Sequence, residues 1–141
     1  MITYFVMLCV QGRRRVLANL QTLEAFKKVI AELRRWEVLA AVIMPDYAYI
    51  IIGPAEDRGL SIGDFVGGFK RLLCKSLGSQ GWEWQRGCFD RLLCSDEDLE
   101  SKWIYVQENP VRAGLVQRSE DWPYYLGFMY HEKLTTATGI S

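Results

Sequence analysis

Histidine is nearly absent from this chain, because His131 is the only one among 141 residues. Cysteine is present but without the CxxC spacing of common zinc sites, since Cys9, Cys74, Cys88 and Cys94 are scattered along the sequence. Zinc sites in proteins are usually built from closely spaced cysteine and histidine ligands. The sequence therefore favours buried free thiols over a zinc site.

A long apolar segment is also missing. The longest uninterrupted apolar run is far shorter than the roughly 18 to 20 residues needed to cross a bilayer, and the N-terminus lacks the order of regions found in a signal peptide. We therefore expect a cytoplasmic protein with no membrane partner. A chain of 141 residues with 50% hydrophobic residues suits one domain, here residues 1–134, and the small polar tail 135–141 is predicted to be flexible.

Charge of one sign is not in excess either, since 17 basic residues balance 17 acidic ones. The field of the whole molecule gives no attraction toward polyanions, so nucleic-acid binding requires a local basic patch. Two groups of cations are candidates, one after the first predicted strand and one on a later helix: Arg13, Arg14, Arg15, Lys70, Arg71 and Lys75. On composition alone, ordinary solvated charges are the simpler interpretation.

The most apolar part of the sequence lies in its middle. It predicts two strands, Val38–Met44 and Tyr47–Ile52, joined by a very short turn. Because nearly every residue in both strands is apolar, we expect a central hairpin that is covered on both faces over part of its length. Side chains alternate along a strand, so Tyr47 and Tyr49 point to one face and Ala48 points to the other.

Further elements follow from the spacing of apolar residues. We expect a strand over Thr3–Val10, a helix over residues 21 to 36, a second helix capped by Ser61, a strand around Cys88–Cys94 and a third helix from Ser95. This order predicts an α+β fold, a ferredoxin-like split βαβ sandwich. Its central antiparallel sheet has helices on one face, and a further C-terminal helix follows.

The third helix carries two different faces. Its apolar face is predicted from Leu99, Trp103 and Val106. Tyr105 and Asn109 are four residues apart and lie on a mostly polar face. The helix is predicted to end near Asn109, because Pro110 disfavours the helical conformation in the residue before it.

Four segments of the chain form a recognisable set. They are Met44 to Tyr49, Gly68 to Lys70, Trp84 to Gly87, and Tyr105 together with the run from Asn109 to Val116. This set resembles the single-tyrosine HUH transposases of bacterial insertion sequences, the IS200-like family, and most of all the REP-associated tyrosine transposases. The resemblance extends from about residue 3 to residue 123, which is nearly the whole chain.

The resemblance implies action on single-stranded DNA, often folded into a hairpin. In the family, a tyrosine on a helix attacks a phosphodiester and keeps the 5′ phosphate, while a divalent cation such as Mg²⁺ or Mn²⁺, held by two histidines on a strand, polarises the phosphate. Tyr105 matches the position of the nucleophile, and Asn109 matches that of a further polar metal ligand. On chemistry alone, Tyr105 would instead be interpreted as a helix residue packed against the sheet.

The chain departs from the family at the two histidines, which Tyr47 and Tyr49 replace. A phenol has a pKa near 10, so its deprotonation to form a good ligand costs about 4 kcal/mol at pH 7. Mg²⁺ holds its waters tightly and is a poor candidate to offset two such costs. We therefore predict that the metal site is absent or badly weakened, with no cofactor. A makeshift oxygen site of Asp46, Glu108 and Asn109 is the less favoured alternative.

Two functional interpretations follow, and the chain is expected to act as a monomer or a homodimer. In the first, the protein holds single-stranded or hairpin DNA without cutting it, and Tyr47 and Tyr49 stack on unpaired bases. The phosphates would be contacted by Arg13, Arg14, Arg15, Lys70, Arg71, Lys75 and Arg86. In the second, Tyr105 still nicks DNA and forms a 5′-phosphotyrosine link. Beside both stands a protein without activity, in which Tyr47 and Tyr49 are buried sheet aromatics.

Overall fold

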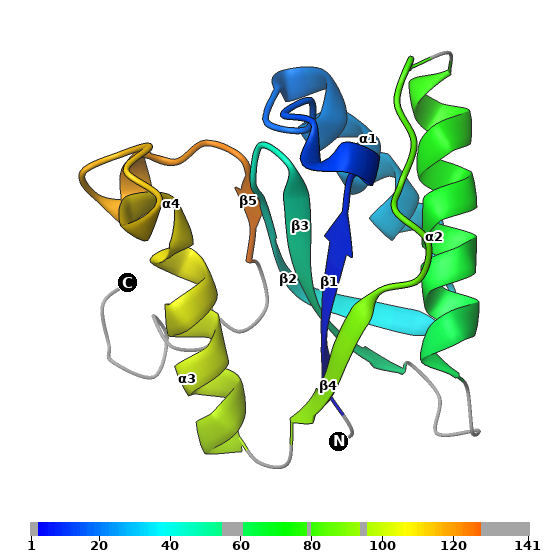
Figure 1. Ribbon diagram of the computed structural model, residues 1–141. Helices are drawn as coiled ribbons and strands as arrows, with labels where there is room; N and C mark the ends of the chain where they lie inside the picture. The colour runs from blue at the N-terminus through cyan, green and yellow to red at the C-terminus, as the bar shows by residue number, and fades with distance from the viewer. Residues whose placement is uncertain (1–2, 55–60, 79, 94–95, 128–141) are drawn as a thin grey trace.

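The structure is a computed structural model that describes residues 3–54, 61–78, 80–93 and 96–127. One antiparallel sheet forms its centre, with the strand order β4-β1-β3-β2-β5 (Figure 1). The strands are β1 (Thr3–Cys9), β2 (Trp36–Ile43), β3 (Tyr47–Pro54), β4 (Phe89–Leu93) and β5 (Tyr125–Leu126). The flexible tail predicted for 135–141, and with it His131 and Cys94, lies outside the described residues.

The helices cover the two faces of the sheet unequally. They are α1 (Leu20–Glu32), α2 (Ile62–Leu77), α3 (Asp96–Gln107) and α4 (Asn109–Arg112), with short 3₁₀ turns η1 (Gln11–Arg13) and η2 (Ser119–Asp121). Helices α1 and α2 lie together on one face, and α3 lies on the other (Figure 1). The predicted α+β fold, with an antiparallel sheet, helices on one face and a further C-terminal helix, is confirmed.

The central hairpin is confirmed as well. Strand β3 lies between β1 and β2, so its backbone groups are paired on both sides. Its alternate side chains are buried on opposite faces, as the apolar composition predicts. Ala48, Ile50 and Ile52 pack in the layer of α1 and α2, whereas Tyr49 and Ile51 pack in the layer of α3.

The first predicted helix is too long. Helix α1 ends at Glu32, and Trp36, which the apolar spacing placed inside the helix, begins β2 opposite Pro54. The ring of Trp36 is buried and packs 5.5 Å from that of Phe65, measured between ring centroids. Sheet pairing and contact with α2 therefore hold Trp36 in β2, and this tertiary packing overrides the local helical pattern.

The other local predictions hold with small changes. Ser61 caps α2, since its side-chain oxygen accepts from the backbone N–H of Asp64 at 3.1 Å. Helix α3 ends at Gln107, and Asn109 begins the short α4 with a proline in its first turn, where the missing N–H costs little. Of the described thiols, Cys9 and Cys74 are half-buried but Cys88 is exposed, so its predicted burial is wrong; all three are free. None of the described helices is both long and apolar enough to span a membrane.

Candidate functional site

Three tyrosines from two elements meet on one face of the sheet. Tyr47 and Tyr49 project from β3 toward α3, and their ring centroids are 5.1 Å apart. Tyr105 lies on α3, close enough for its phenol to raise the pKa of Tyr49. The apolar face predicted for α3 is confirmed, because Leu99, Trp103 and Val106 are buried against the sheet and hold the helix there. We call Tyr47, Tyr49 and Tyr105 the tyrosine cluster.

Tyr49 is the buried member of the cluster. It is only 8% exposed, and its ring packs 4.9 Å from that of Phe5, measured between centroids. Burial is the main reason that its pKa is raised, followed by the neighbouring phenols of Tyr47 and Tyr105; a hydrogen bond with Tyr47 adds to the rise, while one with Asn109 opposes it. The side chain is therefore a neutral phenol at physiological pH. The expectation that Tyr49 stacks on a base is wrong, because no open ring face is left.

Asn109 links the cluster to α4. Its side-chain nitrogen donates to the hydroxyl oxygen of Tyr47 at 2.6 Å, and its side-chain oxygen accepts from Nη2 of Arg112 at 3.2 Å. A guanidinium can only donate, so the oxygen of the amide has to face Arg112 and the nitrogen has to face Tyr47. Asn109 is buried, and this network satisfies both ends of its amide.

Tyr105 is the exposed member of the cluster, with 47% of its surface open to solvent. Two cations lie over its ring: Cζ of Arg112 is 4.1 Å from the ring centroid and Nζ of Lys102 is 4.9 Å from it. Nη2 of Arg112 also donates to the backbone oxygen of Tyr105. Because cations are attracted to the faces of aromatic rings, these contacts favour one orientation of the tyrosine on α3.

Tyr47 is half-buried beside another cation. Cζ of Arg13 lies 5.2 Å from the centroid of the Tyr47 ring, and Nε of the same guanidinium donates to Asp46 at 2.8 Å. The carboxylate of Asp46 is therefore already paired. Arg13, at the end of η1, is the one predicted DNA-contacting cation that lies at the tyrosine cluster itself.

The remaining predicted cations are distributed over several parts of the molecule. Arg86 lies on the same sheet face as the cluster and lines a small cavity of about 230 Å³ with Met7 and Phe89. Nη1 of Arg14 donates to the backbone oxygen of Gly81 at 2.7 Å, and the exposed Arg15 lines a separate cavity.

Helix α2 carries the last three predicted cations in the opposite layer. Nζ of Lys70 donates to the backbone oxygens of Gln85 at 2.9 Å and Gly87 at 2.7 Å, and burial lowers its pKa. This lysine therefore fixes the loop that follows α2. Arg71 and Lys75 are exposed, and their helix packs on the face that receives Ala48 rather than the tyrosines.

Several residues near the cluster were missed by reasoning from the sequence. Lys102 and Arg112 follow a signal that was available, because each lies three residues from Tyr105 or Asn109 along the chain. Phe89 and Arg91 could not be placed from the sequence. They reach this face because β4 pairs with β1 in a register that puts Phe89 opposite Met7 and Arg91 opposite Phe5.

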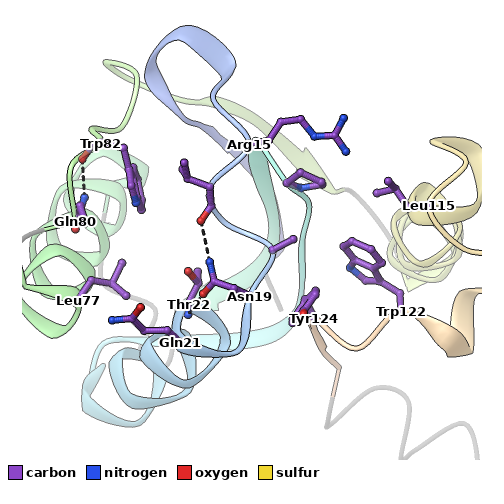
Figure 2. Close-up of a pocket in the computed structure, with 13 residues that line it drawn as sticks. Arg15, Asn19, Gln21, Thr22, Leu77, Gln80, Trp82, Leu115, Trp122 and Tyr124 are labelled. Atoms are coloured by element: carbon purple, nitrogen blue, oxygen red, sulfur yellow. Dashed lines mark hydrogen bonds between the residues drawn. The ribbon is translucent and has the colours of Figure 1, made fainter.

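A separate cavity lies at the N-terminal end of α1. Its volume is about 670 Å³, and Figure 2 shows Asn19 and Thr22 on one side, Trp82 and Gln80 on another, and Trp122 opposite them. Asn19 caps α1 by accepting from the backbone N–H of Thr22 at 2.8 Å. No member of the tyrosine cluster lines this cavity, so the chemistry of the cluster belongs to the open surface of the sheet.

The donor atoms around the tyrosine cluster do not fit a divalent cation. Tyr49 is held as a neutral phenol, the oxygen of Asn109 faces Arg112, and Asp46 is paired with Arg13. Within the described ranges, no three histidine, cysteine, aspartate or glutamate side chains gather where they could hold a metal. The guanidinium of Arg112 occupies the place that an ion would need in order to contact the amide oxygen of Asn109. The positive charges of Arg112 and of a divalent cation would repel each other.

Comparison with known proteins places this geometry in context. No protein-family model matches the chain. The chain is 28% identical over 101 residues to a Haemophilus influenzae protein named as a REP-associated tyrosine transposase, an alignment that covers 63% of this chain. It spans 57% of that relative's length.

Two solved structures share the fold. A REP-associated tyrosine transposase bound to a REP hairpin matches 99% of this chain and 81% of its own, with a TM-score of 0.74 and 23% identity. A transposase from Deinococcus radiodurans matches 76% of this chain and 88% of its own, with a TM-score of 0.53 and 22% identity. These comparisons support the predicted resemblance: the chain is similar in sequence to one REP-associated tyrosine transposase and has the same fold as another.

Proposed function

We propose that this protein binds single-stranded or hairpin DNA on the sheet face beside α3 and that it does not cut the DNA. The observation that carries the proposal is a continuous surface of cations and aromatic rings on that face. We call this surface the basic-aromatic strip, and its members are Arg13, Tyr47, Arg86, Phe89, Arg91, Lys102, Tyr105 and Arg112.

The members of the strip are linked by cation–ring contacts, by strand pairing and by a shared cavity. Lys102 lies over both Tyr105 and Phe5, at 4.9 and 4.5 Å from their ring centroids, and Arg91 is paired with Phe5 across the two strands. The pKa of Lys102 is lowered, mainly by burial and in addition by the positive charge of Arg91. The two cations are therefore close to each other. This concentration of positive charge is local, since the whole chain is neutral.

The same contacts continue toward the hairpin turn. Tyr47 is paired with Cys9 across β3 and β1, and Cys9 lines the small cavity together with Arg86 and Phe89. The strip thus extends from α4 past the tyrosine cluster to β4, along the part of the sheet that α3 leaves open.

The pattern of this strip suits unpaired nucleotides. Phe89 and Tyr105 are 59% and 47% exposed, so each offers a ring surface on which a base can stack, with about 1 to 3 kcal/mol per base. The neighbouring cations can contact phosphates, which supplies most of the affinity and makes it sensitive to salt. The relative whose structure contains a REP hairpin has the same fold over nearly all of this chain, which supports hairpin DNA as the partner.

The absence of cutting is proposed from the surroundings of Tyr105. A phenol attacks a phosphodiester only when its proton is removed and the charge growing on the phosphate is stabilised. The donor set of the cluster does not fit the family's metal, and the phenols beside Tyr105 are weak bases.

One observation favours a second candidate function. Tyr105 is half exposed and flanked by two cations, so a nicking reaction that forms a 5′-phosphotyrosine link remains the alternative.

Binding is tested by fluorescence anisotropy with a labelled DNA hairpin that carries a single-stranded extension. The variant Arg91→Gln/Lys102→Gln should weaken binding about tenfold and flatten the salt dependence. The matched control Arg34→Gln/Arg35→Gln removes the same charge from exposed residues that lie outside the strip, and it should change affinity less than twofold. Equal losses in both variants, or no binding by the natural chain, would contradict the proposed function.

Cutting is tested separately with the same DNA and Mn²⁺. The proposal predicts no covalent protein–DNA adduct on a denaturing gel. An adduct that disappears in Tyr105→Phe would establish the nicking function in its place.

A further inference from the structure

The guanidinium of Arg112 lies beside the tyrosine cluster, next to the residues that match the family's metal-ligand positions. We propose that Arg112 takes over the electrostatic role of the missing cation, so that this site binds a phosphodiester anion directly and without metal. The inference rests on the proposed function, because the anion is a phosphate of the bound DNA.

The position of Arg112 is set by two hydrogen bonds. Its Nη2 donates to the side-chain oxygen of Asn109 and to the backbone oxygen of Tyr105. Its Nη1 and Nε donate to no atom of the described residues and are therefore available to a ligand. Because both hydrogens of Nη2 are engaged, this guanidinium can offer a phosphate oxygen a single charge-assisted hydrogen bond from Nη1 or Nε, together with its fixed positive charge.

A hydroxyl group completes the anion site from the other side. The oxygen of the Tyr47 hydroxyl accepts from Asn109 at 2.6 Å, so its own proton is directed elsewhere. The buried ring of Tyr49 lies beside Tyr47, with 5.1 Å between the ring centroids, which restricts where that proton can point. Tyr47 is half-buried and belongs to the basic-aromatic strip, so its hydroxyl can donate to a phosphate oxygen beside Arg112.

Replacing each histidine with tyrosine changes what the site can bind. A neutral histidine offers a lone pair to a metal, whereas a neutral phenol offers a proton to an anion. Arg112 adds a permanent positive charge within 3.2 Å of the amide oxygen of Asn109. Together these groups donate protons and carry positive charge, which is the chemistry that holds a phosphate and repels a divalent cation.

The first test compares affinities for the labelled hairpin in EDTA and in Mn²⁺, using the natural chain, Arg112→Gln and Arg35→Gln. The natural chain should bind equally well, within twofold, in EDTA and in Mn²⁺. Arg112→Gln should lower the affinity for the hairpin about tenfold, equivalent to about 1.4 kcal/mol, while Arg35→Gln should lower it less than twofold. Arg35 is the matched control because it is exposed before β2, at the end of the hairpin away from Tyr47.

The possible failures are distinguishable. If the natural chain binds no DNA in either buffer, the proposed function fails and the inference fails with it. If DNA binds but requires Mn²⁺, or if Arg112→Gln behaves like Arg35→Gln, the inference alone is overturned and DNA binding stands.

A second measurement needs no variant, since loss of Arg112 could also loosen α4. Inorganic phosphate is added to the ¹⁵N-labelled natural chain, and the side-chain N–H signals of Arg112 and Asn109 are followed by NMR. Both should shift with phosphate, and Mn²⁺ at an equal concentration should leave the Asn109 signal unbroadened. Selective broadening of Asn109 by Mn²⁺, or no shift up to saturating phosphate, would overturn the inference.

Discussion

Strand β3 sends its side chains alternately to two faces of the sheet, and these faces are built differently. On the side of α1 and α2, Ala48, Ile50 and Ile52 meet a continuous apolar layer in which Phe26 and Phe69 pack edge to face at 5.1 Å. On the side of α3, a single helix covers only part of the sheet and leaves a row of cations and aromatic rings exposed. One face therefore stabilises the fold, while the other is available for binding.

The closed face should contribute most to stability. Phe69 has no exposed surface, so Phe69→Ala removes a large side chain from a packed layer and should lower the free energy of unfolding by about 3 to 5 kcal/mol. Phe89→Ala on the open face is the matched control, since Phe89 is 59% exposed, and it should change stability by less than about 0.5 kcal/mol. Urea unfolding followed by tryptophan fluorescence measures both; similar losses in the two variants would remove the distinction between the faces.

The ranking should reverse when DNA affinity is measured. Phe89→Ala removes a ring on which a base can stack, and stacking contributes about 1 to 3 kcal/mol, so affinity for the single-stranded extension should fall at least about fivefold. Phe89→Leu keeps an apolar side chain without the flat ring and should recover little of this loss. Unchanged anisotropy curves for Phe89→Ala would exclude this ring from the binding surface.

Two neighbouring cations on α2 sharpen the comparison further. The ammonium of Lys70 donates to two backbone oxygens, so Lys70→Ala should cost about 1 kcal/mol of stability, a moderate loss because the group is partly exposed. Arg71→Ala should change neither stability nor DNA affinity measurably, since the exposed Arg71 lies in the layer opposite the tyrosines. A tenfold loss of affinity in Arg71→Ala would instead support the sequence-based prediction that α2 contacts phosphates.

The smallest effect concerns pH. The pKa of Tyr49 is raised in the folded protein, mainly by burial, whereas the unfolded chain has the ordinary value near 10. Below about pH 10 both states are protonated; as the pH rises above this value, the unfolded state loses its proton first and the folded state becomes less favoured. The free energy of unfolding should therefore decrease above pH 10. This decrease should be less steep in Tyr49→Phe than in Tyr105→Phe. Equal slopes in these two variants would assign the pH dependence to other groups.

Much of the fold could be predicted from the sequence because the signals were local. The hairpin, the cap at Ser61 and the apolar face of α3 depend on alternation, capping chemistry and helical spacing, which are properties of neighbouring residues. Trp36 was misplaced for the opposite reason. Its environment is set by a partner strand and by Phe65 on another helix, and no local pattern contains that information.

The predictions about the site differ in the same way, according to whether they depend on neighbouring residues or on distant ones. The four-residue spacing placed Tyr105 and Asn109 on one face, and the resemblance to transposases placed them at the site of Tyr47 and Tyr49. In the structure Asn109 is hydrogen-bonded to Tyr47, and Tyr105 is close enough to Tyr49 to raise its pKa. The burial of Tyr49 was not anticipated, because it depends on Phe5 in a neighbouring strand. Nor could the open positions of Phe89 and Arg91 be predicted, since a shift of one residue in the β1–β4 register would turn both to the other face.

The difference between the two faces is tested most directly by mapping where DNA binds. Backbone amide signals of the ¹⁵N-labelled chain can be followed by NMR while the unlabelled hairpin with its single-stranded extension is added in EDTA. We predict that the largest shifts fall on Phe89 to Arg91, Lys102 to Tyr105 and Arg112, with little change along α1 and α2. Shifts concentrated on α1 and α2, or no shifts until a divalent metal is supplied, would contradict the account.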